Sequence, residues 1–431
     1  MTNRIKRWVL CLLASFAAAV FVPLPEAFAE ETELGKIPWP GDAAVSIYDT
    51  EPVFYGNASG LDFHNGRLYA VDNGGGFLWV LEVFPDGTLR PAAGFEIGRA
   101  VQYADRDSVH GPDTEGITVD GEGLVYLAVE RDNDTAWQTG NVILQVDPWD
   151  PSDPIKALRQ WDLTESLPYA PANKGVEAVE WISADAIQGK LTDSNTGLPL
   201  DLAEYPEACG NGVFLVALEA NDQIYAYVLN TDGSAVQVAQ LDPGLKGIVA
   251  LEYDPAEDAL WVTADDRGEN EAAKLLLSQP AGGWVRILPP AGLDPRRNTE
   301  GFAIAEEAFT RDDLRPVYRL QDGVHDGALT IGSMNWHIHT FPEEWIADGQ
   351  QHWHLCRCGE TADVQDHEFV CILTDAARDP SGQDDHMAVY HPICPVCGYV
   401  DRTRSFYDGL DLHPEIADTA VTRQLYGIPC I

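Results

Sequence analysis

The chain has 431 residues, enough for two or three domains, and a formal charge of −42 that comes from 69 acidic against 27 basic residues. This charge repels nucleic acid and anionic membranes and favours the binding of multivalent cations. A solvated acidic surface accounts for most of these carboxylates, so only those that recur at special positions are candidates for a functional site.

A secretory signal peptide is predicted at residues 1–29. The basic segment NRIKRW precedes the apolar run WVLCLLASFAAAVFVPL, and Ala27-Phe28-Ala29 offers a small-x-small cleavage site before Glu30. No later apolar run is long enough to span a bilayer. We therefore expect a mature chain that is secreted, extracellular or held at the cell surface, with no stable membrane insertion after cleavage.

Residues 40–334 consist of recurring units of short alternating strands separated by Gly, Asp and Asn turns. Period-two alternation with turn residues at these intervals predicts hairpins and meanders. Repeated small sheets indicate a β-propeller, and the segment AVSIYDTEPVFYG, ahead of the first unit, would supply strands to a sixth blade. We predict an all-β fold with a six-bladed propeller, and a β-sandwich pair is the competing interpretation. The units begin at Ala58, Asp113, Gly175, Gly247 and Asn298, and residues 183–210 are predicted to be a surface insertion in the third.

Acidic residues recur at equivalent places in these units. A propeller brings equivalent positions together around its central channel, where converging carboxylates repel one another and raise pKa values or recruit a cation. A hard cation with about six to eight oxygen ligands fits such a set, so calcium is predicted. The alternative is that each carboxylate caps a strand or pairs with Arg131 or Arg267. The candidates are Glu115, Glu177 and Glu300 near strand starts, and Asp72, Glu130, Glu219 and Asp265 at strand ends.

The patterns SGLDF…LYAVDN, DTEGITV…VYLAVERDN and NTEGFAI resemble the phytase-like domain family, whose name refers to an esterase-like activity of phytase. The resemblance covers residues 54–333 and implies a secreted propeller with calcium-supported hydrolysis of phosphoesters or esters. Its D-x-E-G element is carried by Asp113, Thr114, Glu115 and Gly116. The later copy has Asn298 in place of the Asp, and the third unit, GVEAVE, has Ala where Gly is expected.

Two classes of function follow, an enzyme and a non-catalytic binding propeller. The chain has no G-x-S-x-G sequence, which argues against a serine hydrolase of the α/β type. A phosphoester reaction would need a metal-activated water and cationic groups on the phosphate oxygens. Ion pairing at a polar rim is the alternative role for these cations, and a surface ligand is the alternative partner to a small phosphoester or ester. The catalytic candidates are Glu115, Arg106, His110 and Arg131, with Arg267 as a further cation.

A second module is predicted at residues 336–404, where His, Trp and Cys are dense, and the tail 405–431 carries no readable chemistry. Two knuckle-like elements, CRCG and CPVCG, would place Cys356, Cys358, Cys394 and Cys397 around one tetrahedral zinc. Disulfides are the default for cysteine in an exported chain. Without Cys11, however, seven of the eight cysteines remain, an odd number that cannot all pair. Zinc is therefore favoured, with His339, His352, His354 and His367 as alternative ligands.

This segment also resembles a small Cys/His-rich repeat of large surface proteins in Gram-positive bacteria. The shared run is HTFPEEWIADGQQHWHLCRCGETADVQDHEF followed by CPVCGY, interrupted here by ILTDAARDPSGQDDHMAVYHP before the second knuckle. The resemblance implies an extracellular accessory module.

Overall fold

The structure is a computed structural model that describes residues 36–48, 53–278, 283–335, 341–356, 361–377, 387–403 and 406–409. The predicted signal peptide lies outside these residues, as does the tail beyond residue 409. Regular structure in the described part of the chain is almost entirely β, with α1 (Ala184–Ile187) and a few 3₁₀ turns. Among the described helices, none has the length and apolar character needed to cross a membrane.

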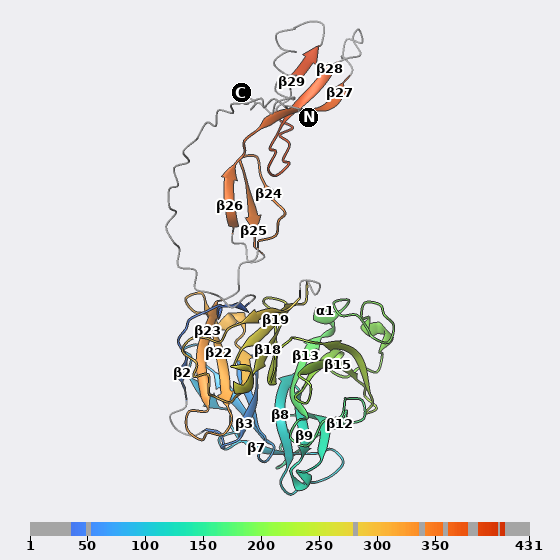
Figure 1. Ribbon diagram of the computed structural model, residues 1–431, viewed down its shortest axis with the longest axis vertical. Coiled ribbons are helices and arrows are strands. Elements are labelled where there is room, and N and C mark those ends of the chain that lie inside the picture. Colours follow the sequence, from blue (N-terminus) through green and yellow to red (C-terminus); the bar gives the residue numbers. More distant parts are fainter. Residues whose placement is uncertain are drawn as a thin grey trace, which may run out of the picture.

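Five antiparallel sheets form the propeller (Figure 1). In each blade the chain enters at the innermost strand and then runs outward, and short strands from elsewhere in the chain join some of the outer edges. Blade one contains β3 (Ala58–His64), β4 (Arg67–Asp72), β5 (Phe77–Val83), β6 (Leu89–Pro91) and β7 (Arg99–Gln102), and blade two contains β8 (Pro112–Val119), β9 (Val125–Asp132), β10 (Thr139–Val146) and β12 (Arg159–Asp162). Blade three contains β13 (Val176–Ser183), β14 (Gly212–Leu218), β15 (Gln223–Leu229) and β16 (Ala235–Leu241). Blade four contains β17 (Ile248–Asp254), β18 (Ala259–Ala264), β19 (Ala272–Leu276) and β20 (Val285–Ile287), and blade five contains β21 (Thr299–Ile304), β22 (Leu314–Gln321) and β23 (Leu329–Asn335).

The prediction of an all-β propeller followed by a Cys/His-rich segment is confirmed, but the predicted number of blades is wrong. The inner strands β3, β8, β13, β17 and β21 contact one another in a closed ring, so five blades complete the circle in the described residues. The described residues before β3 form no blade of their own. Its strand β2 (Ser46–Ile47) pairs with β23 of blade five, and β1 (Lys36–Ile37) pairs with β20 of blade four. A short edge strand, β11 (Ile155–Lys156), pairs with β7 of blade one.

Apolar side chains fill the space between neighbouring blades. The alternating residues of each sheet give five clusters, one for each blade-to-blade junction. The junction of blades five and one contains Phe63 stacked on Tyr318, with 5.9 Å between the ring centroids. Burial of these faces is the main source of stability for a ring in which the inner strands do not pair as a sheet.

The repeated Thr-Glu-Gly sequence is explained by the inner strands. Each inner strand carries an extra residue near its start, a β-bulge that re-aims the side chain toward the channel, and in blade two the partner strand β9 also carries one, Glu130. The extra residue is Glu115 in blade two and Glu300 in blade five. The following glycine is required because neighbouring inner strands approach closely: a Cβ on Gly116 would lie 2.6 Å from the Cα of Ala178, and one on Gly301 would lie 2.4 Å from the Ser59 carbonyl oxygen.

The predicted insertion at 183–210 packs partly into the propeller. Its helix α1 and the loop that follows bury Ile187, Leu191 and Leu200 in the cluster between blades three and four. After β23 the chain forms two small antiparallel sheets (Figure 1). One contains β24 (Ile346–Ala347), β25 (Gln351–Leu355) and β26 (Thr361–Asp366), and the other contains β27 (Val370–Ala377), β28 (Met387–Ile393) and β29 (Phe406–Gly409).

Candidate functional site

The bulged ends of the inner strands open into a cavity of about 460 Å³ at one end of the channel, which we call the acidic cavity. Blades two, three and five contribute Glu115, Glu177 and Glu300, the residues at their bulges. Blade four contributes Val249 at the equivalent place. The sequence-predicted residues Glu219 and Asp265 also line this cavity.

Glu177 lies among other carboxylates without a counter-charge. Its carboxylate accepts no hydrogen bond and forms no ion pair with any described residue. Its oxygen, one from Glu130 and one from Glu219 all lie within 4.8 Å of one another. Burial raises the pKa of Glu177 well above its usual range, and the charges of Glu115, Glu219, Glu300 and Glu130 raise it further.

Glu115 and Glu300 have polar partners but form no ion pair with a described Lys or Arg. The Ser59 hydroxyl and the Asn73 amide donate to Glu115 at 3.0 and 3.2 Å. Burial, followed by the neighbouring charges of Asp113 and Glu300, raises the pKa of Glu115 well above its usual range. The Asn298 amide donates to Glu300 at 2.9 Å, and burial together with the charge of Asp322 raises the pKa of Glu300 to about 8.

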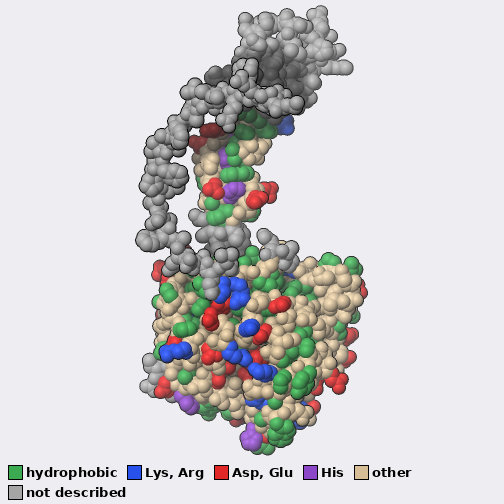
Figure 2. All heavy atoms as spheres, viewed as in Figure 1, with side chains coloured by type: hydrophobic (Ala, Val, Ile, Leu, Met, Phe, Trp, Pro, Cys, Tyr) green, Lys and Arg blue, Asp and Glu red, His purple; other side chains and the backbone are tan. Residues whose placement is uncertain are grey.

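Both arginines of the acidic cavity are already engaged by carboxylates. Arg131 contacts Asp113 at 2.6 Å and Glu130 at 2.5 Å. Arg267 contacts Asp265 at 2.5 Å and also pairs with Glu219, which Lys174 approaches to 3.0 Å. Pairs of this kind are common over the propeller, and Figure 2 shows basic side chains next to acidic ones on the face turned to the viewer. Ion pairs thus hold Glu130, Glu219 and Asp265 at the ends of the second strands but, among the described residues, neither Asp72 nor the carboxylates at the bulges.

The remaining predicted calcium residues lie close to the acidic cavity. Glu130 accepts the Gly175 N–H at 2.6 Å. Asp72 accepts the Gly74 N–H at 3.0 Å, and burial raises the pKa of Asp72 to about 6. Asp322 directly follows β22, at the place equivalent to Glu219 after β14 and Asp265 after β18; it lines the cavity and was missed by the sequence analysis. The turn RLQDG carried the signal for it, since the Asp stands directly after a strand as in the other units.

Two of the catalytic candidates do not line the acidic cavity. Arg106 stacks on the Tyr103 ring, 3.6 Å from its centroid, and pairs with Asp132 at 3.2 Å. His110 is exposed and lies 2.6 Å from Asp134. Glu115 and Arg131 are the two catalytic candidates that the structure places in the cavity.

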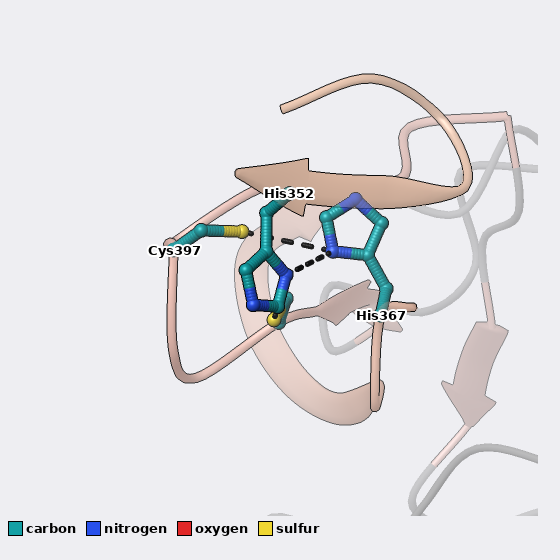
Figure 3. Close-up of side chains that lie close together, drawn as sticks. His352, His367 and Cys397 are labelled. Atoms are coloured by element: carbon teal, nitrogen blue, oxygen red, sulfur yellow. Dashed lines mark hydrogen bonds between the residues drawn. The ribbon is translucent and has the colours of Figure 1, made fainter. Parts of the chain in front are cut away.

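A second cluster of candidate metal ligands joins the two C-terminal sheets. It consists of His352, His367, Cys394 and Cys397, whose ligand atoms all lie within 4.8 Å of one another. Figure 3 shows the His352 and His367 rings turned toward each other, with the Cys397 sulfur close to His367. The Nδ1 atoms of the two rings are 3.3 Å apart, Cys394 Sγ is 3.8 Å from Nδ1 of His352, and Cys397 Sγ is 3.7 Å from Nδ1 of His367.

These separations match the edges of a tetrahedron around one zinc ion. Zn–N bonds of about 2.05 Å and Zn–S bonds of about 2.3 Å imply N···N edges of about 3.3 Å and N···S edges of about 3.5 Å. His367 Nε2 lies 2.8 Å from the Asp348 carbonyl oxygen, which can only accept, so this nitrogen carries the proton and Nδ1 is free to bind a metal. Burial raises the pKa of Cys394, but the backbone N–H of Cys397 and other donors lower it more, to about 7.

The cluster differs in part from the predicted zinc set. Cys394 and Cys397 belong to it, and two of the alternative histidines, His352 and His367, supply its other members. Cys356 is buried and is not one of the four, while Cys358 lies outside the described residues. His354 stacks on Trp345 instead, with 3.9 Å between ring centroids, and His339 also lies outside the described residues.

Neither family models nor curated protein sequences match the chain. Solved structures that resemble it include the glutaminyl cyclase of Myxococcus xanthus, with 13% identity over 69% of this chain and 99% of that chain and a TM-score of 0.40. A streptogramin B lyase matches with 10% identity over 85% of this chain and 87% of the other, at a TM-score of 0.29. The WD40 domain of Toxoplasma gondii coronin matches with 10% identity over 86% and 77%, at a TM-score of 0.30. All three TM-scores are below 0.5, and the propeller assignment rests on the strand order of this chain.

Proposed function

We propose that the propeller binds a divalent cation, calcium, in the acidic cavity and recognises its ligand there. The observation that carries the proposal is Glu177, a nearly buried carboxylate that faces four others without a donor or a cation among the described residues. Such an arrangement is stable only if the group takes up a proton or a cation. Carboxylate oxygens from Glu115, Glu130, Glu177, Glu219 and Glu300 are hard ligands of the kind that calcium prefers.

The charge of the cavity favours a cation over an anion. Its lining contains seven carboxylates against two guanidinium groups, and Arg131 and Arg267 are both paired. A phosphate group entering this cavity without a metal would meet a net negative field and would have to displace a carboxylate from an arginine. Binding through a cation is therefore better supported than direct binding of a phosphoester.

Calcium titration of the purified chain by isothermal calorimetry tests the proposal. Glu177→Gln removes one charged ligand with little change in shape and is expected to weaken or abolish calcium binding in the cavity. Glu122→Gln is the matched control, because Glu122 is exposed in the turn between β8 and β9. Equal binding of calcium by wild type and both variants would contradict the proposal.

Hydrolysis of a phosphoester or ester is the second candidate function. It is supported by two residues that line the same cavity: Glu115, whose raised pKa suits a general base, and Arg131, which could stabilise an anion. The resemblance to the phytase-like family is in keeping with it. A bound divalent ion would supply an activated water and offset the negative field.

Turnover of an aryl phosphate and an aryl acetate, with calcium and with chelator, separates the two candidates. Hydrolysis predicts a calcium-dependent rate that Glu115→Gln lowers and that Arg131→Ala lowers more for the phosphate than for the acetate. Calcium binding without turnover of either substrate would leave the binding function and remove the support for hydrolysis.

We also infer that the protein acts outside the cytoplasm. The basic and apolar segments before Ala27-Phe28-Ala29 support export. Detection of a mature N-terminus at Glu30 in the exported fraction would test this inference, and a chain retained with its first residues intact would contradict it.

For the C-terminal module we propose a zinc ion bound by His352, His367, Cys394 and Cys397. The tetrahedral separations and the proton on Nε2 of His367 support it. Zinc would hold the two small sheets together, since β25 and the residues after β26 supply the histidines and the loop after β28 supplies the cysteines.

Metal content by mass spectrometry of the purified chain decides between the two ligand sets. The histidine-containing set predicts about one zinc per chain in wild type, in His354→Ala and in Cys356→Ser, and loss of zinc in His367→Ala. The four-cysteine set predicts the reverse for Cys356→Ser and His367→Ala. Thiols that appear only after reduction would show that disulfides form instead.

A further inference from the structure

The opposite end of the channel contains a second group of carboxylates, on the inner strands of blades one, three and four. The side chains at this level accept the backbone N–H of the next inner strand, so they join strands that are not paired as a sheet. The bonds are Val119 N–H to Asp62 at 2.6 Å, Trp181 N–H to Thr118 at 3.0 Å, Tyr253 N–H to Glu180 at 3.0 Å, and Ile304 N–H to Glu252 at 2.9 Å.

These bonds use only one oxygen of each glutamate. The Oε2 atoms of Glu180 and Glu252 have no hydrogen-bond partner among the described residues. Both are buried, since the two residues are only 6% and 4% exposed. A buried ionised oxygen without a donor is costly, so an unmet charge here calls for a proton or a cation. Accepting an inter-strand hydrogen bond explains why the side chains at this level are polar. It does not explain why three of the four are acidic, because Thr118 accepts the equivalent bond with a hydroxyl.

The three carboxylates converge on one point. Single oxygens of Asp62, Glu180 and Glu252 all lie within 4.8 Å of one another. Ca–O distances are about 2.4 Å, so oxygens on opposite sides of one calcium ion lie about 4.8 Å apart. Oxygens this close together can ligate one calcium ion with side-chain shifts of about 0.4 Å or less, which need no change of blade position.

No cation of the described chain neutralises this group. The carboxylates line a cavity of about 620 Å³, in which Arg315 is the one Lys or Arg among the lining residues. The Arg315 guanidinium is buried and donates to both oxygens of Asp254, at 3.0 and 2.8 Å, and to the Ala305 carbonyl. It is thus held by other acceptors.

We propose that Asp62, Glu180 and Glu252 bind a second divalent cation, calcium, at the floor of this opposite cavity. The ion would link blades one, three and four across the channel. Its remaining coordination positions would face the cavity, open to water or to a ligand with oxygen donors. The site is separate from the acidic cavity: Glu177 and Glu180 lie three residues apart on β13, about 10 Å along a strand.

Calcium stoichiometry, measured by isothermal calorimetry on the purified chain in four forms, tests this proposal. The forms are wild type, Glu252→Gln, Glu177→Gln and the double variant. Glu252→Gln keeps the carbonyl oxygen that accepts the Ile304 N–H and removes one charged ligand. It is expected to lose one equivalent of calcium both in the wild-type background and in the Glu177→Gln background. The result does not depend on whether the acidic cavity binds calcium, so the two proposals fail separately.

Thr118→Val is the matched control. It removes an inter-strand hydrogen bond at the same level without removing a carboxylate. Its melting temperature should therefore be lower than that of wild type, while its calcium stoichiometry should be unchanged. Glu180→Gln is the second variant, from a different blade, and it should lose the same equivalent if Glu252→Gln does not fold. Unchanged stoichiometry in a folded Glu252→Gln or Glu180→Gln would overturn the proposal and show that the carboxylates share protons instead.

Discussion

Replacing Glu177 with Gln should stabilise the metal-free propeller and at the same time reduce its stabilisation by calcium. Glu177 has an oxygen within 4.8 Å of oxygens from Glu130 and Glu219. Two unit charges at that distance, with an effective dielectric constant of about 20, repel by about 3.5 kcal/mol. Protonation of one carboxyl relieves this repulsion, so the net destabilisation of the folded state is smaller than the repulsion itself. Glu177→Gln removes the repulsion between this carboxylate and its neighbours, so the melting temperature of the variant in chelator should equal or exceed that of wild type.

In calcium, wild type should melt at a higher temperature than Glu177→Gln. A ligand at a hundredfold excess over its dissociation constant stabilises the native state by about 2.7 kcal/mol. With an unfolding entropy of about 2.1 cal/mol/K per residue, a propeller of about 300 residues gains about 1.6 °C per kcal/mol, so the wild-type melting temperature should rise by about 4 °C. Differential scanning calorimetry of wild type, Glu177→Gln and Glu122→Gln, in calcium and in chelator, measures both effects. A calcium shift in Glu177→Gln as large as in wild type, or a variant that is less stable in chelator, would refute the reasoning.

Three further predictions concern the channel. In chelator the melting temperature should fall as pH rises from about 5 to about 8.5. Burial raises the pKa of Glu300 to about 8 and that of Asp72 to about 6, so in this range the folded state holds protons that the unfolded state has lost. A melting temperature that stays constant or rises with pH would contradict this. Gly116→Ala places a Cβ 2.6 Å from the Cα of Ala178 and should lower the free energy of unfolding, measured in urea, by about 1–3 kcal/mol. Gly140→Ala, with no neighbouring atom within 4 Å of its Cβ, should lower it less. Equal losses in the two variants would mean that the inner strands can move apart. Thr118→Val leaves the Trp181 N–H without its acceptor and should cost about 1–3 kcal/mol in the same assay, so an unchanged midpoint would show that the bond is dispensable.

The propeller and the acidic residues at its bulges could be predicted because they recur. Thr-Glu-Gly appears twice, and the structure explains two of its three residues: the Glu is the extra residue of a bulge, and the Gly allows close approach of the next inner strand. The number of blades could not be counted in the same way. Strands β1 and β2 have two residues each, and a strand that short does not specify which sheet edge it joins.

The group at the opposite end of the channel escaped the sequence analysis because its members lie inside strands. Asp62, Glu180 and Glu252 each stand two residues after the Gly or Ala that follows a bulge, in the runs GLD, AVE and ALE. That common offset was a usable signal, but alternation alone treats a buried acidic residue as an exposed one. For the Cys/His cluster, the choice of His367 over Cys356 depends on how β25 pairs with β26, which the spacing of the cysteines does not determine.

Anomalous scattering from crystals grown with Mn²⁺ would locate the divalent cations and test whether the acidic cavity binds one. We predict a peak in the acidic cavity coordinated by Glu177 together with at least two of the surrounding carboxylates, and its loss in Glu177→Gln. An acidic cavity without a peak in wild-type crystals, with the Glu177 carboxyl hydrogen-bonded to a neighbouring carboxylate through a shared proton, would contradict it.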